Sequence, residues 1–418
     1  MRLASVPRRI LRALGPGVTT GAADDDPSGI ATYSIAGAQF GTGLLWMAWL
    51  TWPLMGAVQM MCARIGMVTG MGLAGALRLK FPRWLVGLAA MALLVANIIN
   101  IASDLAGMAD AAEMLGAGSS HVYVAVFGVG IALASIRLRY HQIASVLKWL
   151  ALVLFAYIAA AIIMKPHWPG ILASALRPSW PRGREAWATV VAILGTTISP
   201  YLFFWQAGQE VEEEKAMGRR LLKEREGATR TEIVDRRIDV GIGTLFSNVV
   251  MFFVILSTAL TLHAHGITQV TTTRGAAEAL RPLAGDAAYL LYSLGIVGTG
   301  LLAIPTLAGS AAYALAETFD WAYGLDQRFS QAASFYAVFA VSIVAGIGLD
   351  FLNVDPIRAL FWTAVVNGLL APFLMIGIWL VASDTKVMNG QTSTPLSRAT
   401  VAIAALLMLG DAAGLFLL

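Results

Sequence analysis

The sequence predicts an all-α integral membrane protein that crosses the bilayer eleven times, with its first and sixth crossing helices broken in mid-membrane. Composition is the first observation: 58% of the 418 residues are hydrophobic and 13% are charged, whereas soluble domains carry about 25% charged residues. Apolar segments long enough to span a bilayer recur along the chain. Two of these segments are interrupted by a proline beside polar residues, which removes a backbone donor inside the span.

A crossing helix needs about 20 mostly apolar residues, and eleven segments meet that requirement. They lie near 16–41, 43–68, 84–114, 120–137, 143–164, 186–209, 240–264, 285–316, 331–349, 356–382 and 398–417. Lysine and arginine gather in one alternate set of the intervening loops. Because cytoplasmic loops carry the basic excess, we expect a multi-pass protein of the cell (inner or plasma) membrane with a cytoplasmic N-terminus.

The remaining composition argues against other classes of protein. Cys62 is the single cysteine, so neither an internal disulfide nor a multi-cysteine metal site can form. The net charge is +4, and the basic residues lie in the loops between apolar spans. This placement indicates that they orient the protein in the membrane rather than bind nucleic acid. The sequence contains no pairing of a nucleophile with a base, so we expect neither an enzyme nor a cofactor. The lipid bilayer is an expected partner, and protein partners stay open.

The two breaks have similar local chemistry. The first is Asp-Asp-Asp-Pro-Ser-Gly at 24–29, and the second is Gly-Thr-Thr-Ile-Ser-Pro-Tyr at 195–201. Asp and Ser are good N-caps and Pro suits the first helical position, so Asp26 and Ser199 should each begin a second half-helix. The preceding half-helices would leave unpaired carbonyls at 22–25 and 195–198. Carbonyl oxygens and a carboxylate together should attract a cation.

Matching breaks in the first and sixth spans predict an internal repeat. Residues 1–164 would form the first half and 186–382 an inverted second half, with 398–417 as an extra helix in a single transporter domain. Secondary transporters built in this way bind their substrate near the midplane, between the halves. The charged residues of 210–239 predict a solvated cytoplasmic connector, which could also bind a partner.

Several motifs resemble the Nramp family of divalent-metal transporters. They are Gly-Pro-Gly at 15–17, Asp-Pro-Ser-Gly at 26–29, Gly-Ala-Gln-Phe-Gly at 37–41, Asp-Leu-Ala at 104–106 and the second break. The resemblance implies a LeuT-like inverted repeat of five plus five spans. It also implies four metal-ligand positions, which fall here at Asp26, Gly29, Ser199 and the carbonyl of Thr196.

The departures from the family pattern bear on the substrate. The family's Asn, Met and His become Gly29, Ser199 and Tyr201, and the acid after Asp-Leu-Ala becomes Gly107. This pattern is similar to the Nramp-related magnesium transporters. Loss of a thioether removes a preference for soft metals, and shorter side chains should enlarge the cavity for a hydrated Mg²⁺. Because an unperturbed Tyr titrates at about 10, we also expect little or no proton coupling.

Further polar residues are candidates for lining the cavity or for a relay. They are Asp24, Asp25, Ser28, Asn97, Asn100, Asp104, Tyr201, Gln206 and Asn367. Neighbouring residues on a helix are offset by about 100°, so the three consecutive aspartates should not all face one point, and one could line an approach vestibule. Helix capping is an alternative role for Asp26 and Ser199, and helix–helix bonding for the two asparagines of span three.

Three functions follow from these observations. The first is a secondary-type transporter of divalent cations, with hydrated Mg²⁺ expected and Mn²⁺ as a second substrate. A proton-coupled Mn²⁺/Fe²⁺ importer is the second, and the missing Met and His argue against it. A transporter of a different small solute or an anion on the same scaffold is the third, because half-helix N-termini can hold anions.

Overall fold

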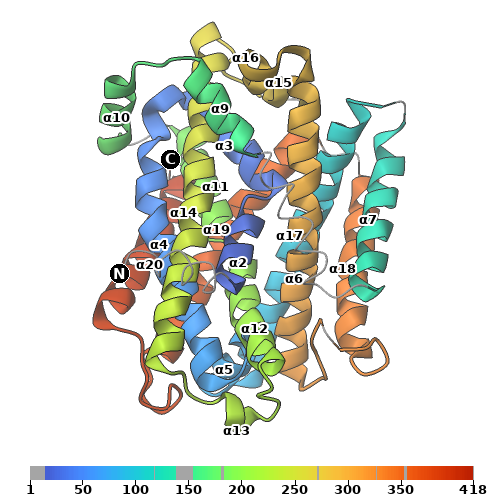
Figure 1. Cartoon of the computed structure of the whole chain (residues 1–418), viewed down its shortest axis with the longest axis vertical. Helices are drawn as coiled ribbons and strands as arrows, with labels where there is room; N and C mark the ends of the chain where they lie inside the picture. Colours follow the sequence, from blue (N-terminus) through green and yellow to red (C-terminus); the bar gives the residue numbers. More distant parts are fainter. Residues whose placement is uncertain are drawn as a thin grey trace, which may run out of the picture.

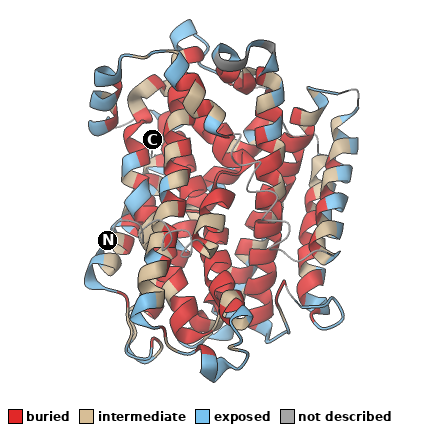
Figure 2. Ribbon diagram, in the orientation of Figure 1, coloured by how far each residue is buried: buried red, intermediate tan, exposed pale blue. Residues whose placement is uncertain are grey.

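A computed structural model describes residues 15–116, 118–137, 154–179, 183–270, 273–325, 327–352 and 355–417. All regular structure in this part of the chain is helical. The long helices stand side by side, while short helices cover the two ends, with α10, α15 and α16 at one end and α5 and α13 at the other (Figure 1). Buried residues fill the interior of the bundle and exposed ones lie on its periphery and loops (Figure 2).

The main helices follow the order of the predicted spans. They are α2 (Pro16–Asp24), α3 (Pro27–Phe40), α4 (Trp46–Thr69), α6 (Arg83–Glu113), α7 (Ser120–Arg137), α9 (Phe155–Ile163), α11 (Arg184–Thr197), α12 (Pro200–Ala216), α14 (Arg230–Thr261), α17 (Ala288–Phe319), α18 (Ala333–Asp350), α19 (Pro356–Ala382) and α20 (Pro395–Leu417). The short ones are α5 (Leu73–Arg78), α10 (Trp168–Leu176), α13 (Leu222–Arg225), α15 (Thr273–Ala277) and α16 (Arg281–Ala284).

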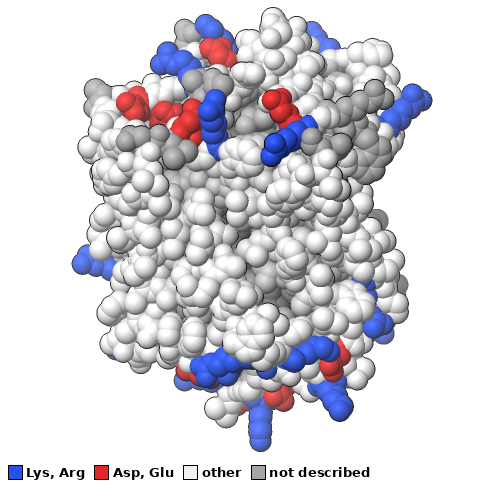
Figure 3. All heavy atoms as spheres, turned by 180° about the vertical axis from the view of Figure 1, so that it is seen from behind, with Lys and Arg blue, Asp and Glu red and all other residues white. Residues whose placement is uncertain are grey.

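Within the described residues, eight helices are long and apolar enough to cross a membrane, or nine if the bent pair 27–44 and 46–69 counts as one span. The first predicted span is divided between α2 and α3, and most of the fifth, at 143–164, lies outside the described residues. Charged side chains gather at the two ends of the molecule and leave a broad, almost uncharged band between them (Figure 3). This distribution is typical of a protein that spans a bilayer.

Both predicted breaks are present, and they share one backbone pattern. After α2, Asp25 has φ/ψ of −82°/51° and Asp26 has −69°/170°, and α3 then begins at Pro27. After α11, Ile198 has −115°/58° and Ser199 has −75°/134°, and α12 then begins at Pro200. Each break is therefore two residues long and ends at a proline that starts the next half-helix.

The half-helices beside the breaks pack closely through glycines. A Cβ at Gly21 would lie 2.3 Å from the backbone oxygen of Gly243, and one at Gly243 would lie 2.2 Å from that of Gly17. Likewise, a Cβ at Gly195 would lie 2.0 Å from the backbone oxygen of Ala364. No other residue fits at such distances, so glycine allows α14 to approach α2 and α19 to approach α11.

The stretch 210–239 is not the single solvated connector that its charges predict. Helix α12 continues to Ala216 and α14 begins at Arg230. Arg236 is 8% exposed and pairs with Glu210 at 2.7 Å, with Glu213, and with Asp239 at 2.5 Å. Asp239 in turn accepts hydrogen bonds from the first amides of α2, those of residues 15, 17 and 18. Arg236, Glu210 and Asp239 are buried and Glu213 is partly exposed, and together these charges join the ends of α2, α12 and α14.

Candidate functional site

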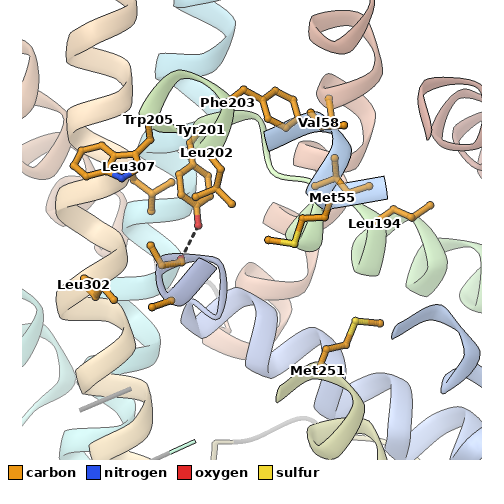
Figure 4. Close-up of a cluster of buried hydrophobic side chains, with 14 of the residues drawn as sticks. Met55, Val58, Leu194, Tyr201, Leu202, Phe203, Trp205, Met251, Leu302 and Leu307 are labelled. Carbon is orange, nitrogen blue, oxygen red and sulfur yellow. Dashed lines mark hydrogen bonds between the residues drawn. The ribbon is translucent and has the colours of Figure 1, made fainter. Parts of the chain in front are cut away.

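The two breaks meet in the interior, as the predicted site requires. The hydroxyl of Tyr201 on α12 donates a 2.9 Å hydrogen bond to the backbone oxygen of Ala23 on α2 (Figure 4). A Cβ at Gly29 would lie 3.2 Å from Oγ1 of Thr196, which belongs to the second break. The hydroxyls of Tyr33 and Thr197 are 3.2 Å apart. Residues that are more than 160 positions apart in the chain are thus in contact.

Asp26 is both a helix cap and a buried carboxylate with one oxygen left for another partner. Its Oδ1 accepts hydrogen bonds of 2.7 Å from the Ser28 hydroxyl and from the Gly29 amide, as an N-cap does. Among the described residues, its Oδ2 accepts a single hydrogen bond, of 3.2 Å, from Nδ2 of Asn100 on α6. The side chain is 1% exposed. The capping and ligand roles therefore use different oxygens and are compatible.

Asp24 and Asp25 face one point on α14, whereas Asp26 faces α6, so the three aspartates do not all face one point, as expected. The hydroxyl of Ser247 on α14 lies 2.5 Å from Oδ2 of Asp24 and 3.3 Å from Oδ1 of Asp25. They converge because the chain leaves the helix after Asp24, so the 100° offset no longer applies. Both are fully buried, so neither lines an open vestibule in this structure.

The second break is more closed than its sequence predicts. The Ser199 hydroxyl donates to the backbone oxygens of Gly195 at 2.8 Å and Thr196 at 2.7 Å, instead of capping α12. Two of the carbonyls that were expected to be free are thus partnered. Thr196 Oγ1, which is buried, fills the space that the small Gly29 leaves. The larger cavity expected at 29 and 199 is therefore not seen there.

Of the polar candidates elsewhere, three belong to a hydrogen-bonded group that includes Asp26, and two do not. Nδ2 of Asn100 donates to Oδ2 of Asp104 at 3.0 Å as well as to Asp26, and Nδ2 of Asn367 on α19 lies 3.4 Å from Oδ1 of Asn100. Asn97, in contrast, donates to α17, at the Leu307 backbone oxygen and the Ser310 hydroxyl. Gln206 bonds to Glu210 on its own helix.

Sequence reasoning missed Ser247, although a signal for it exists. Residues 244, 247 and 248 of the apolar helix α14 are Thr, Ser and Asn, at the i, i+3 and i+4 spacing of one helix face. All three are buried, and Asn248 accepts a 2.6 Å bond from the Thr51 hydroxyl on α4. Such a stripe predicts a polar contact with another helix, but it does not say which helix.

The donors around Asp26 define the chemistry of the site. Within the described residues, no three or more His, Cys, Asp and Glu side chains converge as a metal-binding group. A cation beside Asp26 would therefore be bound by carboxylate, amide, hydroxyl and carbonyl oxygens together. Such oxygen donors suit hard ions such as Mg²⁺ and Mn²⁺.

This all-helical bundle, in which two broken helices enclose buried carboxylates, has the LeuT-like fold that the sequence predicts. The family described as "Natural resistance-associated macrophage protein-like" (Nramp) matches residues 17–417, and this chain belongs to that family. It is 27% identical to the divalent metal cation transporter MntH of Ralstonia nicotianae over 401 residues, which cover 91% of this chain and 85% of the relative. It is 26% identical to MntH of Aeromonas hydrophila, with 96% and 94% covered.

Solved structures agree on the fold. The Eremococcus coleocola manganese transporter, in complex with an aromatic bis-isothiourea substituted compound, superposes with a TM-score of 0.75 at 16% identity and covers 97% of this chain and 88% of its own. Mhp1, a nucleobase-cation-symport-1 family transporter in a closed conformation, gives a TM-score of 0.55 at 14% identity, with 96% and 92% covered.

Proposed function

We propose that this protein is a secondary-type transporter that carries divalent metal cations across the cell membrane. One observation carries the proposal: the buried Asp26 carboxylate lies where two broken helices meet, with Oδ2 directed at α6. An ionisable group inside a membrane protein indicates function, and paired broken helices indicate a transporter's binding site. The names of the MntH relatives support the same activity. In this proposal residues 1–164 and 186–382 form the two inverted halves, and the N-terminus is cytoplasmic.

The proposed substrates are hard divalent cations. Mn²⁺ is supported by the manganese transporter among the structures with this fold, and nothing in the comparisons favours the Mg²⁺ preference expected from the sequence. The oxygen donors near Asp26 nevertheless suit both ions, since carboxylate, carbonyl and water ligands bind Mg²⁺, Ca²⁺ and Mn²⁺ alike. We therefore propose Mn²⁺ as the main substrate and Mg²⁺ as a second, with soft ions such as Cd²⁺ disfavoured.

Weak or absent proton coupling is part of the proposal. Tyr201 stands where the family's His was expected, and its hydroxyl proton is used in the bond to the Ala23 backbone oxygen. A phenol in this position provides no group that titrates near neutral pH. Cation entry would then be driven by the membrane potential and the ion gradient. Stoichiometric acidification of proteoliposomes during Mn²⁺ entry would contradict this part of the proposal.

Uptake into proteoliposomes tests the function. The protein should take up Mn²⁺ and Mg²⁺ but not Cd²⁺ or an anion panel, and Asp26→Ala should abolish cation uptake. Asp411→Ala is the matched control, because Asp411 is a buried acid (7% exposed) on α20, outside the proposed repeats. Undiminished uptake by Asp26→Ala, or anion uptake by the unmodified protein, would overturn the proposal.

A further inference from the structure

The side-chain amide of Asn100 lies between two buried carboxylates. Its Nδ2 is 3.2 Å from Oδ2 of Asp26 and 3.0 Å from Oδ2 of Asp104. Asn100 and Asp104 are fully buried, and Asp26 is 1% exposed. Among the described residues, Oδ1 of Asp104 is buried without a hydrogen-bond partner. Two acids are thus held around one point by the weakly positive end of a neutral amide.

The NH₂ group of Asn100 lies between the two carboxylates, which is where a cation would be attracted. The two ends of an amide have nearly the same shape, so a half-turn about the last side-chain bond exchanges its nitrogen for its oxygen. The reversed amide would direct Oδ1 at the two carboxylates, which is unfavourable in an empty site and favourable beside a cation. Asn367, whose Nδ2 now faces Oδ1 of Asn100 at 3.4 Å, can accept from the reversed amide through its own oxygen.

We propose that Oδ2 of Asp26, Oδ2 of Asp104 and Oδ1 of Asn100 form a divalent-cation site that opens when the Asn100 amide reverses. The inference rests on the proposed function and specifies where the cation binds. The proposed ligands thus lie at the first break and on α6, and the second break contributes none. Gly29, beside the first break, offers no side-chain ligand, and at the second break the Ser199 hydroxyl bonds to the Thr196 carbonyl.

The chemistry of the three groups fits the proposed substrates. Two carboxylates balance the charge of a divalent cation, which keeps the buried site neutral. All three donors are oxygens, as hard cations require, and Mg²⁺ is commonly held by one or two carboxylates with water completing its shell. The amide supplies a neutral third oxygen and, in the empty site, the donors that hold the acids together.

Calorimetric titration of the purified full chain with Mn²⁺ tests this site, with Asn97 as the matched control. Asn97 is on the same helix, three residues earlier and equally buried, but it bonds to α17. Asn97→Ala should change the Mn²⁺ affinity by less than about twofold, whereas Asn100→Ala should lower it by about 10- to 100-fold, the usual cost of a lost group at a metal site. Asn100→Asp should bind at least as tightly as the unmodified protein, because it keeps an oxygen ligand.

The outcomes separate this inference from the proposed function. If Asn100→Ala binds like Asn97→Ala while Asp26→Ala does not bind, the α6 site is wrong and the transporter function stands. If Asn100→Asp loses as much affinity as Asn100→Ala, then Asn100 only donates hydrogen bonds and is not a ligand. If the unmodified protein binds and transports no divalent cation, the proposed function itself fails. Should Asn100→Ala not fold, the isosteric Asp104→Asn replaces it, and unchanged Mn²⁺ affinity in that variant would also overturn the site.

Discussion

The Tyr201 hydroxyl and the Ala23 backbone oxygen are joined by a 2.9 Å hydrogen bond that connects the two broken helices. Ala23 lies in the last turn of α2, where a helix leaves carbonyl oxygens without intrahelical partners. Tyr201 lies in the first turn of α12 and is fully buried. The bond thus gives a hydrogen-bond donor to one carbonyl of the first break that lacks an intrahelical partner. Because the donor comes from the second break, the bond also holds the two breaks together.

Removing this bond should destabilise the protein without changing how transport depends on pH. Tyr201→Phe keeps the ring and leaves the Ala23 oxygen buried without this donor, at a cost of about 1–3 kcal/mol. Denaturant titration in detergent measures the cost. Mn²⁺ uptake as a function of pH should keep its shape, because the phenol carries no transported proton in our proposal. A changed pH profile would show that Tyr201 takes part in proton movement.

The contact between Gly29 and Thr196 predicts a pair of substitutions that compensate. In Gly29→Ala the new Cβ would lie 3.2 Å from Thr196 Oγ1, which is closer than an ordinary contact, so it should displace the Thr196 hydroxyl. Overpacking typically costs about 1–3 kcal/mol of folding stability, which denaturant titration in detergent measures. Thr196→Ala in the same chain should restore much of it. Independent, additive effects in this double-mutant cycle would argue against the contact.

Two glycines on α14 allow a matched test of its packing against α2. Gly243→Ala would place a Cβ 2.2 Å from the Gly17 backbone oxygen, whereas Gly241→Ala meets nothing within 4 Å. We expect Gly243→Ala to lower the free energy of unfolding by about 1–3 kcal/mol. Gly241→Ala should raise it by up to about 1 kcal/mol through helix propensity. Melting temperatures in detergent would measure both. Equal effects of the two substitutions would contradict the close approach.

The charge network at the ends of α2, α12 and α14 should be far more sensitive than pairs nearer the surface. Arg236→Met leaves buried carboxylates without their cation, and breaking such a pair costs about 3–5 kcal/mol. Lys80, whose side chain is 29% exposed and pairs with Asp384 at 2.8 Å, is the control, and Lys80→Met should cost less than about 1 kcal/mol. Chemical denaturation measures the loss of unfolding free energy in each variant. Similar losses in Arg236→Met and in the control would mean that the Arg236 network is solvated.

Acid should weaken two connections between helix ends. A hydrogen bond from Arg78 lowers the pKa of Asp320 below its ordinary value of 3.8, and one from Lys80 lowers the pKa of Asp384. A carboxylate with a lowered folded-state pKa stabilises the fold above its unfolded pKa and loses that effect as pH falls through the folded value. The melting temperature should therefore drop below about pH 4, and less steeply in Asp320→Asn/Asp384→Asn. Identical acid slopes would show that these bonds contribute nothing.

The two breaks could be predicted from local chemistry, whereas the contacts between distant helices could not. An Asp or Ser followed by proline indicates where a half-helix begins, so both starts could be identified from sequence, although only Asp26 caps its helix with the side chain. The contact of Ser247 with Asp24 depends on which helices pack together, and no local pattern specifies that. Asn97 and Asn100 are only about 60° apart around α6, and the sequence alone could not separate the one that faces α17 from the one that faces Asp26.

The shared backbone pattern of the two breaks has a mechanical consequence. Residues 25–26 and 198–199 are outside any helix and are followed by prolines, which have no amide hydrogen to donate. Rotation of α3 against α2, or of α11 against α12, can therefore be absorbed in these few dihedral angles while the helical ladders on both sides stay intact. Asp26, the residue that binds the cation in our proposal, thus also belongs to one of the two hinges about which access can alternate between the two sides of the membrane.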